Sequence, residues 1–305
     1  MDDARQVALK KRYLAAADRF VAVVKDDPNV IAVIINGSLA YDVVWEKSDI
    51  DMTLVIRDQV LKNNSYSIIE DGININVNLQ IRSNFKRDME KSIGGSFSQS
   101  YFAKSKIIYS TDNSLYEYFE DLREIGSDDI ALSTLLIAGE LIGLYDKTQK
   151  WLLVRKDLLY AQYYLLKAAE VVARMVLCLH GVPVARDTMQ KALEIAPAAI
   201  TPFYHEAMSH HFTQEEILSG IQRLDKYIEQ HLDIIKKPVL EFMADGEIKT
   251  STLIARHFNI DSHFIVNVFD YLAEKGVIER VSQTIRITPK GKLAHEELGY
   301  LYISD

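Results

Sequence analysis

The order of hydrophobic and polar positions changes along the chain, from a mixture of helix and strand patterns to helical ones. Residues 4 to 25 carry apolar side chains at helical spacing, and the apolar run of residues 30 to 35 is typical of a buried strand. A second apolar run at residues 50 to 56 and a strictly alternating stretch at residues 73 to 81 predict two further strands. From about residue 127 to 233 the periodicity is helical. The pattern therefore predicts an α/β part followed by a helical part.

The first predicted strand ends abruptly at Asn36-Gly37, which predicts a tight turn. Glycine has no Cβ, so the backbone at Gly37 can approach a ligand closely. The N–H groups of Gly37 and Ser38, together with the Ser38 hydroxyl, are candidate donors to phosphate oxygens. A lone Gly-Ser pair is also compatible with a turn that has only a structural role.

Two carboxylates lie on either side of Ile50, where the second strand begins. Because side chains alternate along a strand, Asp49 and Asp51 should project from one face. Paired carboxylates suit Mg²⁺, whose remaining positions are often filled by substrate phosphates. The structural alternative is an acidic turn that enters a strand. The order of the two motifs after a hydrophobic strand favours a site that acts on a nucleotide.

The stretch of residues 73 to 81 has one aliphatic face and one amide face. Two interpretations of the amide face stay open. It is either the solvated side of an antiparallel sheet, or Asn76 and Asn78 line the same cleft as Asp49 and Asp51. The sequence Glu70-Asp71-Gly72 predicts a turn before this strand.

The first strand is followed by Gly37-Ser38 and, after an interval of about ten residues, by Asp49-Ile50-Asp51. This order resembles the signature of the nucleotidyltransferase superfamily, which has a DNA polymerase beta-like fold. Within that superfamily the chain looks most like the kanamycin nucleotidyltransferases. The resemblance implies an α/β (α+β) nucleotidyltransferase fold and a nucleoside triphosphate, ATP above all, as substrate. It also implies that Gly37 and Ser38 hold the phosphate tail.

These relatives carry a third acidic residue on a following strand, and the matching position here is Asn76. The resemblance thus implies a Mg²⁺ site made by Asp49, Asp51 and Asn76. An amide oxygen can bind a metal but supplies no charge, so metal affinity should be lower than in the relatives. A second departure is Asp42, because many relatives have a basic residue and a glycine shortly after Gly-Ser.

The helical part contains a shorter match, in which Asp146 lies four residues before Lys150-Trp151. By the resemblance, Asp146 is the general base that takes a proton from the acceptor hydroxyl, and Lys150 contacts the nucleotide phosphates. The implied acceptor is an aminoglycoside-like small molecule, although the sequence does not separate small-molecule from protein acceptors. Some relatives build their site from two subunits, which implies a homodimer.

Composition narrows the class of protein. The chain has 305 residues, of which 48% are hydrophobic. That length predicts two or three domains at the usual scale of roughly 100 to 200 residues each. Without a signal peptide or an uninterrupted apolar span, we expect a cytoplasmic protein that has no membrane partner. The net charge of −8 argues against a general nucleic-acid binder but does not exclude a local basic face.

The last 70 residues or so have a pattern of their own. We expect helices at residues 238–243, 251–258 and 262–275, strands at 276–280 and 284–288, and a last helix. This order resembles a winged helix. If it bound DNA, the base-reading residues would be His263 and Asn267, and those near phosphates would include Arg280, Arg286, Lys290 and Lys292. Acids at positions 261, 270 and 274 oppose phosphate binding, which leaves a protein-interaction or dimerisation role open.

The sequence therefore predicts three domains: residues 1–122, nucleotidyltransferase-like; residues 123–234, helical and acceptor-binding; and residues 235–305, a winged helix. The predicted reaction is transfer of a nucleoside monophosphate from Mg-ATP to a hydroxyl acceptor, with Asp49, Asp51 and Asp146 as catalytic residues. The competing interpretation is a catalytically weakened fold that senses a ligand and regulates transcription through the winged helix.

Overall fold

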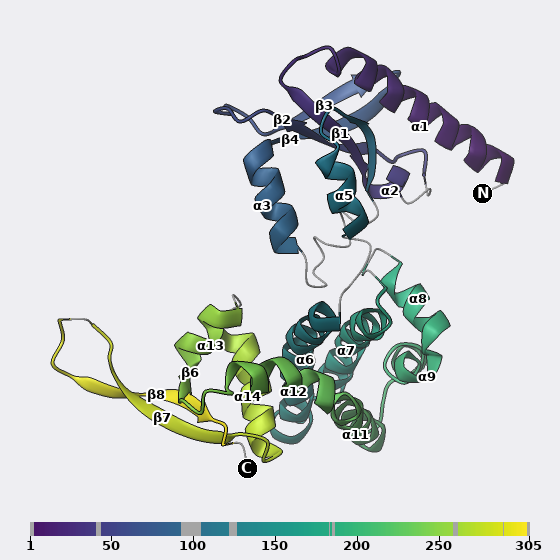
Figure 1. Ribbon diagram of the computed structural model, residues 1–305. Coiled ribbons are helices and arrows are strands. Elements are labelled where there is room, and N and C mark those ends of the chain that lie inside the picture. Colours follow the sequence, from purple (N-terminus) through teal and green to yellow (C-terminus); the bar gives the residue numbers. More distant parts are fainter. Residues whose placement is uncertain are drawn as a thin grey trace. The chain divides into compact units, whose positions relative to one another are not determined.

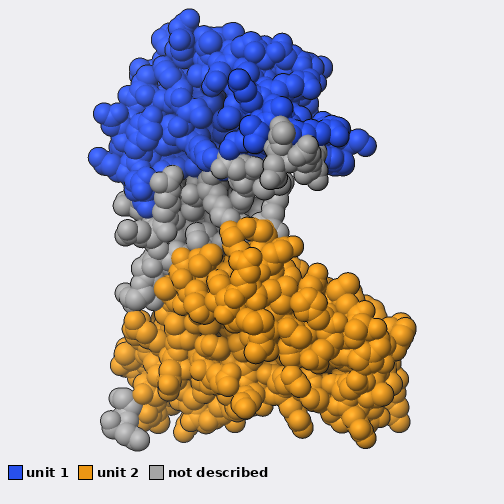
Figure 2. Space-filling view, turned by 90° about the vertical axis from the view of Figure 1, so that its right-hand side faces the viewer, with its two compact units in different colours: residues 1–126 blue, residues 127–305 orange. Residues whose placement is uncertain are grey.

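The computed structural model divides into two compact units, residues 1–126 and residues 127–305 (Figures 1 and 2). The structure describes residues 3–40, 44–92, 105–121, 127–182, 184, 187–258, 262–288 and 290–303. Each unit has its own hydrophobic core and is described by itself. No helix in these described ranges is both long enough and apolar enough to cross a membrane.

A five-stranded sheet of order β3-β4-β2-β1-β5 forms the centre of the first unit. Its strands are β1 (Val30–Asn36), β2 (Ile50–Ile56), β3 (Ser65–Glu70), β4 (Ile73–Ile81) and β5 (Lys106–Ser110). β2 and β4 run parallel, and the other neighbouring pairs are antiparallel. The three predicted strands are confirmed. The two that the sequence pattern missed, β3 and β5, are the edge strands, where exposed side chains weaken the apolar signal.

A two-residue turn joins β3 to β4, as Glu70-Asp71-Gly72 predicts. Asp71 and Gly72 both have positive φ, 50° and 71°, which is the backbone of a turn that matches the twist of a hairpin. The turn fixes the register of the hairpin and thereby pairs Ser67 with Asn76.

Helices cover both faces of the sheet (Figure 1). The helix α1 (Asp3–Val24), predicted at residues 4 to 25, buries Tyr13, Ala16 and Ala17 against one face. The other face is covered by α3 (Arg82–Ser92) and α5 (Ser114–Asp121), which contribute Phe85, Leu115 and Phe119. The tight turn expected after Asn36 is instead one turn of helix, α2 (Gly37–Ala40), which buries Leu39 and Ala40.

The second unit begins with a helical bundle. Its helices are α6 (Ser127–Gln149), the π-helix η1 (Lys150–Val154), α7 (Leu158–Leu179), α8 (Thr188–Ile195), α9 (Pro197–Ile200), α10 (His205–Ser209), α11 (Gln214–Gln230) and α12 (Leu232–Phe242). The helical periodicity predicted for this part of the chain is confirmed. An apolar stripe on α6 and α7 packs into one core with the later helices.

The long apolar stretch from residue 152 to 180, followed by Gly181 and Pro183, predicts one helix that ends at the glycine, but the helix begins only at Leu158. The chain leaves the helical path between η1 and α7, where Lys156 has φ of 56°. Asp157 then caps α7 by accepting a hydrogen bond from the Tyr160 N–H at 2.9 Å. The predicted end is confirmed, because α7 stops at Leu179 and Gly181 takes positive φ, 65°.

The C-terminal segment adds two helices and a small sheet to the second unit. These are β6 (Lys249–Thr250), α13 (Ser251–Phe258), α14 (Ser262–Glu274), β7 (Glu279–Arg286) and β8 (Ala294–Leu301), and the sheet has order β6-β8-β7. The two short strands expected at residues 276 to 288 are one strand, β7. The prediction of a last helix was wrong, because residues 294 to 301 form a strand that pairs with β7 and buries Tyr300 in the core.

The core of the second unit continues across the predicted boundary at residue 234. Buried side chains on both sides of it, from Leu135 of α6 to Tyr300 of β8, belong to one cluster. The structure divides into two compact units, and the finer division into three domains stays a prediction.

Candidate functional site

The end of β1 is held by a buried polar network centred on Asn36. Its amide nitrogen donates to the Thr53 hydroxyl of β2 at 2.9 Å, and its oxygen accepts from the Ser105 hydroxyl at 2.8 Å. All three side chains are buried, so breaking this network would leave unpaired polar atoms in the core. The network fixes the point at which the chain leaves the sheet and enters Gly37.

Three polar side chains come together where the inner strand β2 begins beside β4: Asp49, Asp51 and Asn76. Parallel pairing of β2 with β4 places Asp51 beside Asn76, and Asp49 precedes β2 by one residue. The Asn76 amide nitrogen donates to an oxygen of Asp49 and, at 3.4 Å, to Oδ1 of Asp51. All three side chains are half-buried. The structure thus assembles the three residues that the sequence assigned to a metal site.

Gly37 lies against one of these carboxylates, that of Asp51. A Cβ at this position would overlap Oδ2 of Asp51, and the φ of Gly37 is 63°. Both the space and the backbone conformation therefore require glycine. Ser38 follows it and is half-buried at the start of α2. Asp42, the acid that departs from the relatives' pattern, lies outside the described residues.

The loop that leads into Asp49 is anchored to α1 by Tyr13. The buried Tyr13 ring places its hydroxyl 2.8 Å from the carbonyl oxygen of Ser48 and 3.2 Å from that of Trp45. The Ser48 hydroxyl in turn accepts from the Trp45 N–H at 3.0 Å. Asp49 is therefore held from the residue before it as well as by Asn76.

The orientation of Asn76 bears on whether these residues fit a metal ion. Its oxygen accepts from the Ser67 hydroxyl at 2.9 Å and from the Asn74 amide at 3.3 Å, so the nitrogen faces the two aspartates. Carboxylates only accept hydrogen bonds, which favours this orientation in the protein alone. Two half-buried carboxylates within reach of the same amide fit a divalent cation, because Mg²⁺ prefers oxygen ligands of this kind. Asn76 would join as an oxygen ligand only after its amide turned over.

The carboxylate pair is a small ligand set. No group of three or more His, Cys, Asp or Glu side chains that could hold a metal is found among the described residues. Mg²⁺ is commonly held by one or two carboxylates with substrate phosphates, so a pair is compatible with Mg²⁺ bound together with a nucleotide.

Asp146 and Lys150 belong to the second unit. Asp146 lies on α6 and lines a cavity of about 460 Å³ between α6, α7 and α14. Burial is the main cause that raises the pKa of Asp146, and Glu274 and Asp270 of α14 raise it further, although part of the side chain reaches solvent. Lys150 is the first residue of η1 and is exposed.

The residues predicted to contact DNA lie on α14, which carries the two predicted base readers, and at the end of β7 and the turn after it. Asn267 donates its amide to the Gly139 carbonyl of α6 at 3.4 Å, so its side chain is turned toward the bundle. Arg286 and Lys290 are exposed. The His263 side chain lies outside what the structure describes.

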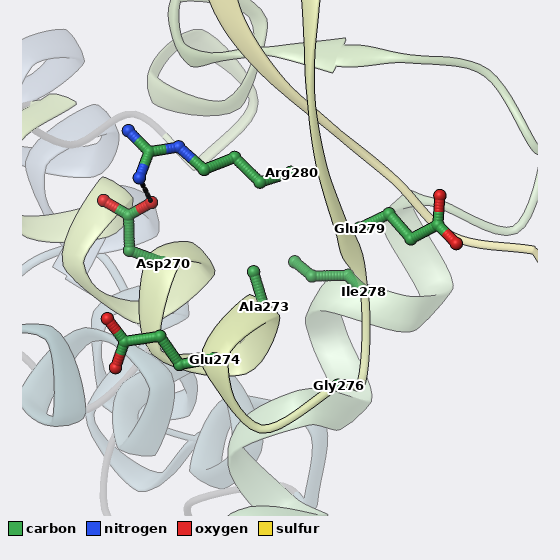
Figure 3. Close-up of a pocket in the computed structure, with 7 residues that line it drawn as sticks. All are labelled: Asp270, Ala273, Glu274, Gly276, Ile278, Glu279 and Arg280. Carbon is green, nitrogen blue, oxygen red and sulfur yellow. Dashed lines mark ion pairs between the residues drawn. The ribbon is translucent and has the colours of Figure 1, made fainter.

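A second cavity, of about 610 Å³, lies between α14 and β7 (Figure 3). Its charged lining is mostly acidic, with Asp270, Glu274 and Glu279 beside Arg280. The Arg280 guanidinium lies 3.5 Å from a carboxylate oxygen of Asp270, so its charge is already engaged (Figure 3). This cavity is therefore poorly suited to phosphate.

Sequence reasoning missed two polar partners of the site. Ser67 orients Asn76, and Thr53 binds Asn36. Ser67 was missed because β3 was not predicted. Thr53 lies inside the apolar run of residues 50 to 56, and a hydroxyl there is the signal that could have revealed a buried polar contact.

A known crystal structure resembles the whole chain. It is that of a nucleotidyltransferase-like protein from Exiguobacterium sibiricum, with a TM-score of 0.67 and 14% sequence identity. The match covers 95% of this chain and 99% of the other. No protein-family model matches the chain, and no curated protein matches it.

The chain therefore shares the fold of this nucleotidyltransferase-like protein. At 14% identity this likeness shows the fold alone.

Proposed function

We propose that this protein is a nucleotidyltransferase that moves a nucleoside monophosphate from a Mg-nucleoside triphosphate, ATP above all, to a hydroxyl acceptor. The observation that carries the proposal is the half-buried pair Asp49 and Asp51, which share the Asn76 amide, with Asp51 packed against Gly37. The pair lies where β2 begins and the glycine where β1 ends, in a chain that shares the fold of a nucleotidyltransferase-like protein.

Asp49 and Asp51 would hold the Mg²⁺, with Asn76 as a third ligand once its amide turns over. When bound, the ion would neutralise charge on the triphosphate. Gly37 and Ser38 would donate N–H groups to the phosphate tail, and the lack of a side chain at Gly37 leaves room for the Asp51 carboxylate beside them.

Asp146 is the proposed general base and Lys150 the proposed phosphate contact. The acceptor oxygen would form a bond to the α-phosphorus, pyrophosphate would leave, and the acceptor's proton would pass to the Asp146 carboxylate. The raised pKa of Asp146 supports this role, because a base is more effective as its pKa approaches the working pH.

The C-terminal segment supports the winged-helix prediction by its order of elements. Two helices are followed by a β7–β8 hairpin, and a short β6 completes the sheet. We do not propose that α14 reads DNA, since the Asn267 amide is turned to α6 and Arg280 is paired with Asp270. This segment instead forms one wall of the cavity that contains Asp146.

Transfer can be tested by pyrophosphate release from labelled ATP with Mg²⁺ and a panel of acceptors that includes an aminoglycoside and protein partners that co-purify. We expect release by the wild type and a loss of at least about a hundredfold in Asp49→Asn, because one carboxylate is removed without a change in shape. Asp18→Asn, an exposed acid on α1, is the matched control and should leave release unchanged. Equally little pyrophosphate from the wild type and Asp49→Asn with every acceptor would contradict the proposal.

A further inference from the structure

Aromatic and basic side chains gather where η1 joins α7 in the second unit. We call six of them the aromatic–basic surface: Lys147, Trp151, Arg155, Tyr160, Tyr163 and Lys167. In this acidic protein of net charge −8, three of the six are cations. The proposed transfer reaction uses Lys150 of η1 but gives none of these six side chains a role.

The rings form a continuous row. Trp151 meets Tyr160 edge to face with 4.3 Å between ring centroids, and Tyr160 lies 5.6 Å from Tyr163. A half-buried ring, Tyr164, lies 5.4 Å from Tyr160 and supports the row from the core side. Tyr160 and Tyr163 remain 41% and 45% exposed. Flat apolar surface of this kind is open to a further stacking partner.

The cations lie over the rings instead of pairing with acids. The Arg155 guanidinium is 5.9 Å from the Trp151 ring, and Lys167 Nζ is 5.3 Å from the Tyr163 ring. Lys147 Nζ is 5.9 Å from the Tyr164 ring. Among the residues the structure describes, none of these three cations forms an ion pair with a carboxylate. Their charge is available to an anionic ligand.

The backbone beneath the surface is irregular. In η1 the Arg155 N–H donates to the Lys150 carbonyl at 3.1 Å, a spacing of five residues, and Lys156 has positive φ, 56°. π-helical turns and left-handed backbone at a residue other than glycine are costly and often occur at functional sites. The irregular turn is what brings Trp151 against Tyr160, because α6 and α7 are separated by it.

We propose that the aromatic–basic surface binds a single-stranded nucleic acid. Bases would stack on the exposed faces of Tyr160 and Tyr163. Backbone phosphates would contact Lys147, Arg155 and Lys167. Stacking rings combined with cations is how proteins hold single strands without reading their sequence. This inference goes beyond the proposed transfer reaction and does not depend on Asp49 or Asp51.

Charge favours this ligand over two others. An aminoglycoside is a polycation and would be repelled by the three cations of the surface. A second protein chain could cover the exposed apolar side chains Leu153, Val154 and Leu159 nearby, but it would also have to satisfy those cations. A strand of nucleic acid supplies both phosphates and flat rings.

Binding can be measured by fluorescence anisotropy of labelled 12-nucleotide single strands, RNA and DNA, on the full chain at low salt. We expect micromolar binding that weakens with salt, with a slope of log K against log salt of about −2 for three phosphate contacts. Tyr163→Ala and Lys167→Gln should each weaken binding about tenfold. Tyr163→Phe keeps the ring and should bind as the wild type does.

Matched controls separate the surface from the rest of the chain. Tyr116→Ala removes an equally exposed ring from α5, and Lys226→Gln removes an exposed cation from α11, so both should bind like the wild type. Asp49→Asn should also bind normally even though it loses transfer. In Trp45→Phe the only remaining tryptophan is Trp151, and its fluorescence should be quenched by the strand.

Three results would overturn the inference. One is no binding of any strand at low salt. Another is equal competition by free AMP at the same concentration of nucleotides, which would indicate a mononucleotide site. The third is self-association that Tyr163→Ala abolishes while no strand binds, which would assign the surface to a second copy of the chain.

Discussion

Asn76 stands beside both carboxylates of the first unit and donates to each. Its orientation depends on Ser67, which belongs to a strand that the sequence pattern did not reveal. The residues Gly37, Asp49 and Asp51 could be predicted from their own spacing. The orientation of the Asn76 amide could not be predicted, because it is decided by hydrogen-bond partners distant in the sequence.

Replacing the amide tests what it does in the site. In Asn76→Asp a third negative charge joins two others, so we expect a lower melting temperature in EDTA than for the wild type. In the same variant, affinity for Mn²⁺, a spectroscopic substitute for Mg²⁺, should rise about tenfold, or about 1.4 kcal/mol, because a divalent ion gains a charged ligand. Electron paramagnetic resonance titration of Mn²⁺ and thermal unfolding would measure both changes.

Asn78→Asp is the control for that comparison. Asn78 lies on the same face of β4, two residues further along, and pairs with Thr53 instead of an aspartate. It should leave both the melting temperature and Mn²⁺ affinity near wild-type values. If Asn76→Asp also leaves Mn²⁺ affinity unchanged, Asn76 does not adjoin the metal position.

At the scale of elements, helical periodicity and turn residues predicted α1, α13 and most of α14 closely, because each has a clear apolar stripe and a clear end. The C-terminal strand β8 was mistaken for a helix. Its sequence contains helix-forming residues such as Glu and Leu, and pairing with both β6 and β7 overrides that preference. Local patterns cannot show pairing between distant segments.

The packing of α14 on α6 leads to a prediction about two glycines. A Cβ at Gly139 would lie 2.5 Å from the backbone oxygen of Phe264, whereas one at Gly143 would meet only the end of the Asn267 side chain, at 3.0 Å. Alanine in a helix ordinarily stabilises relative to glycine by up to about 1 kcal/mol. We expect Gly139→Ala to destabilise the protein by about 1–3 kcal/mol, because a backbone cannot move aside as a side chain can.

Gly143→Ala is the internal comparison and should be neutral or slightly stabilising. Urea unfolding followed by far-ultraviolet circular dichroism would report both variants. Equal unfolding midpoints for Gly139→Ala and Gly143→Ala would show that the two helices do not approach as closely as the structure has them.

At the scale of the whole molecule, the chain combines a sheet unit that contains the carboxylate pair with a helical unit that contains Asp146 and the aromatic–basic surface. The division near residue 126 follows the change from strand to helix periodicity in the sequence. The single core of the second unit did not follow from the sequence, because contacts such as the hydrogen bond from the Tyr271 hydroxyl to Asp225, 2.8 Å long, join α14 to α11 across the predicted boundary at residue 234.

The central claim is that Asp49 and Asp51 hold a Mg-nucleotide, and its most direct test is calorimetric titration of a non-hydrolysable ATP analogue. We predict binding in Mg²⁺ that falls at least about tenfold in EDTA and in Asp51→Asn, with Asp18→Asn unaffected. Thermal unfolding would verify that Asp51→Asn is folded. Equal affinity of the wild type with Mg²⁺, the wild type with EDTA and Asp51→Asn with Mg²⁺ would contradict the account.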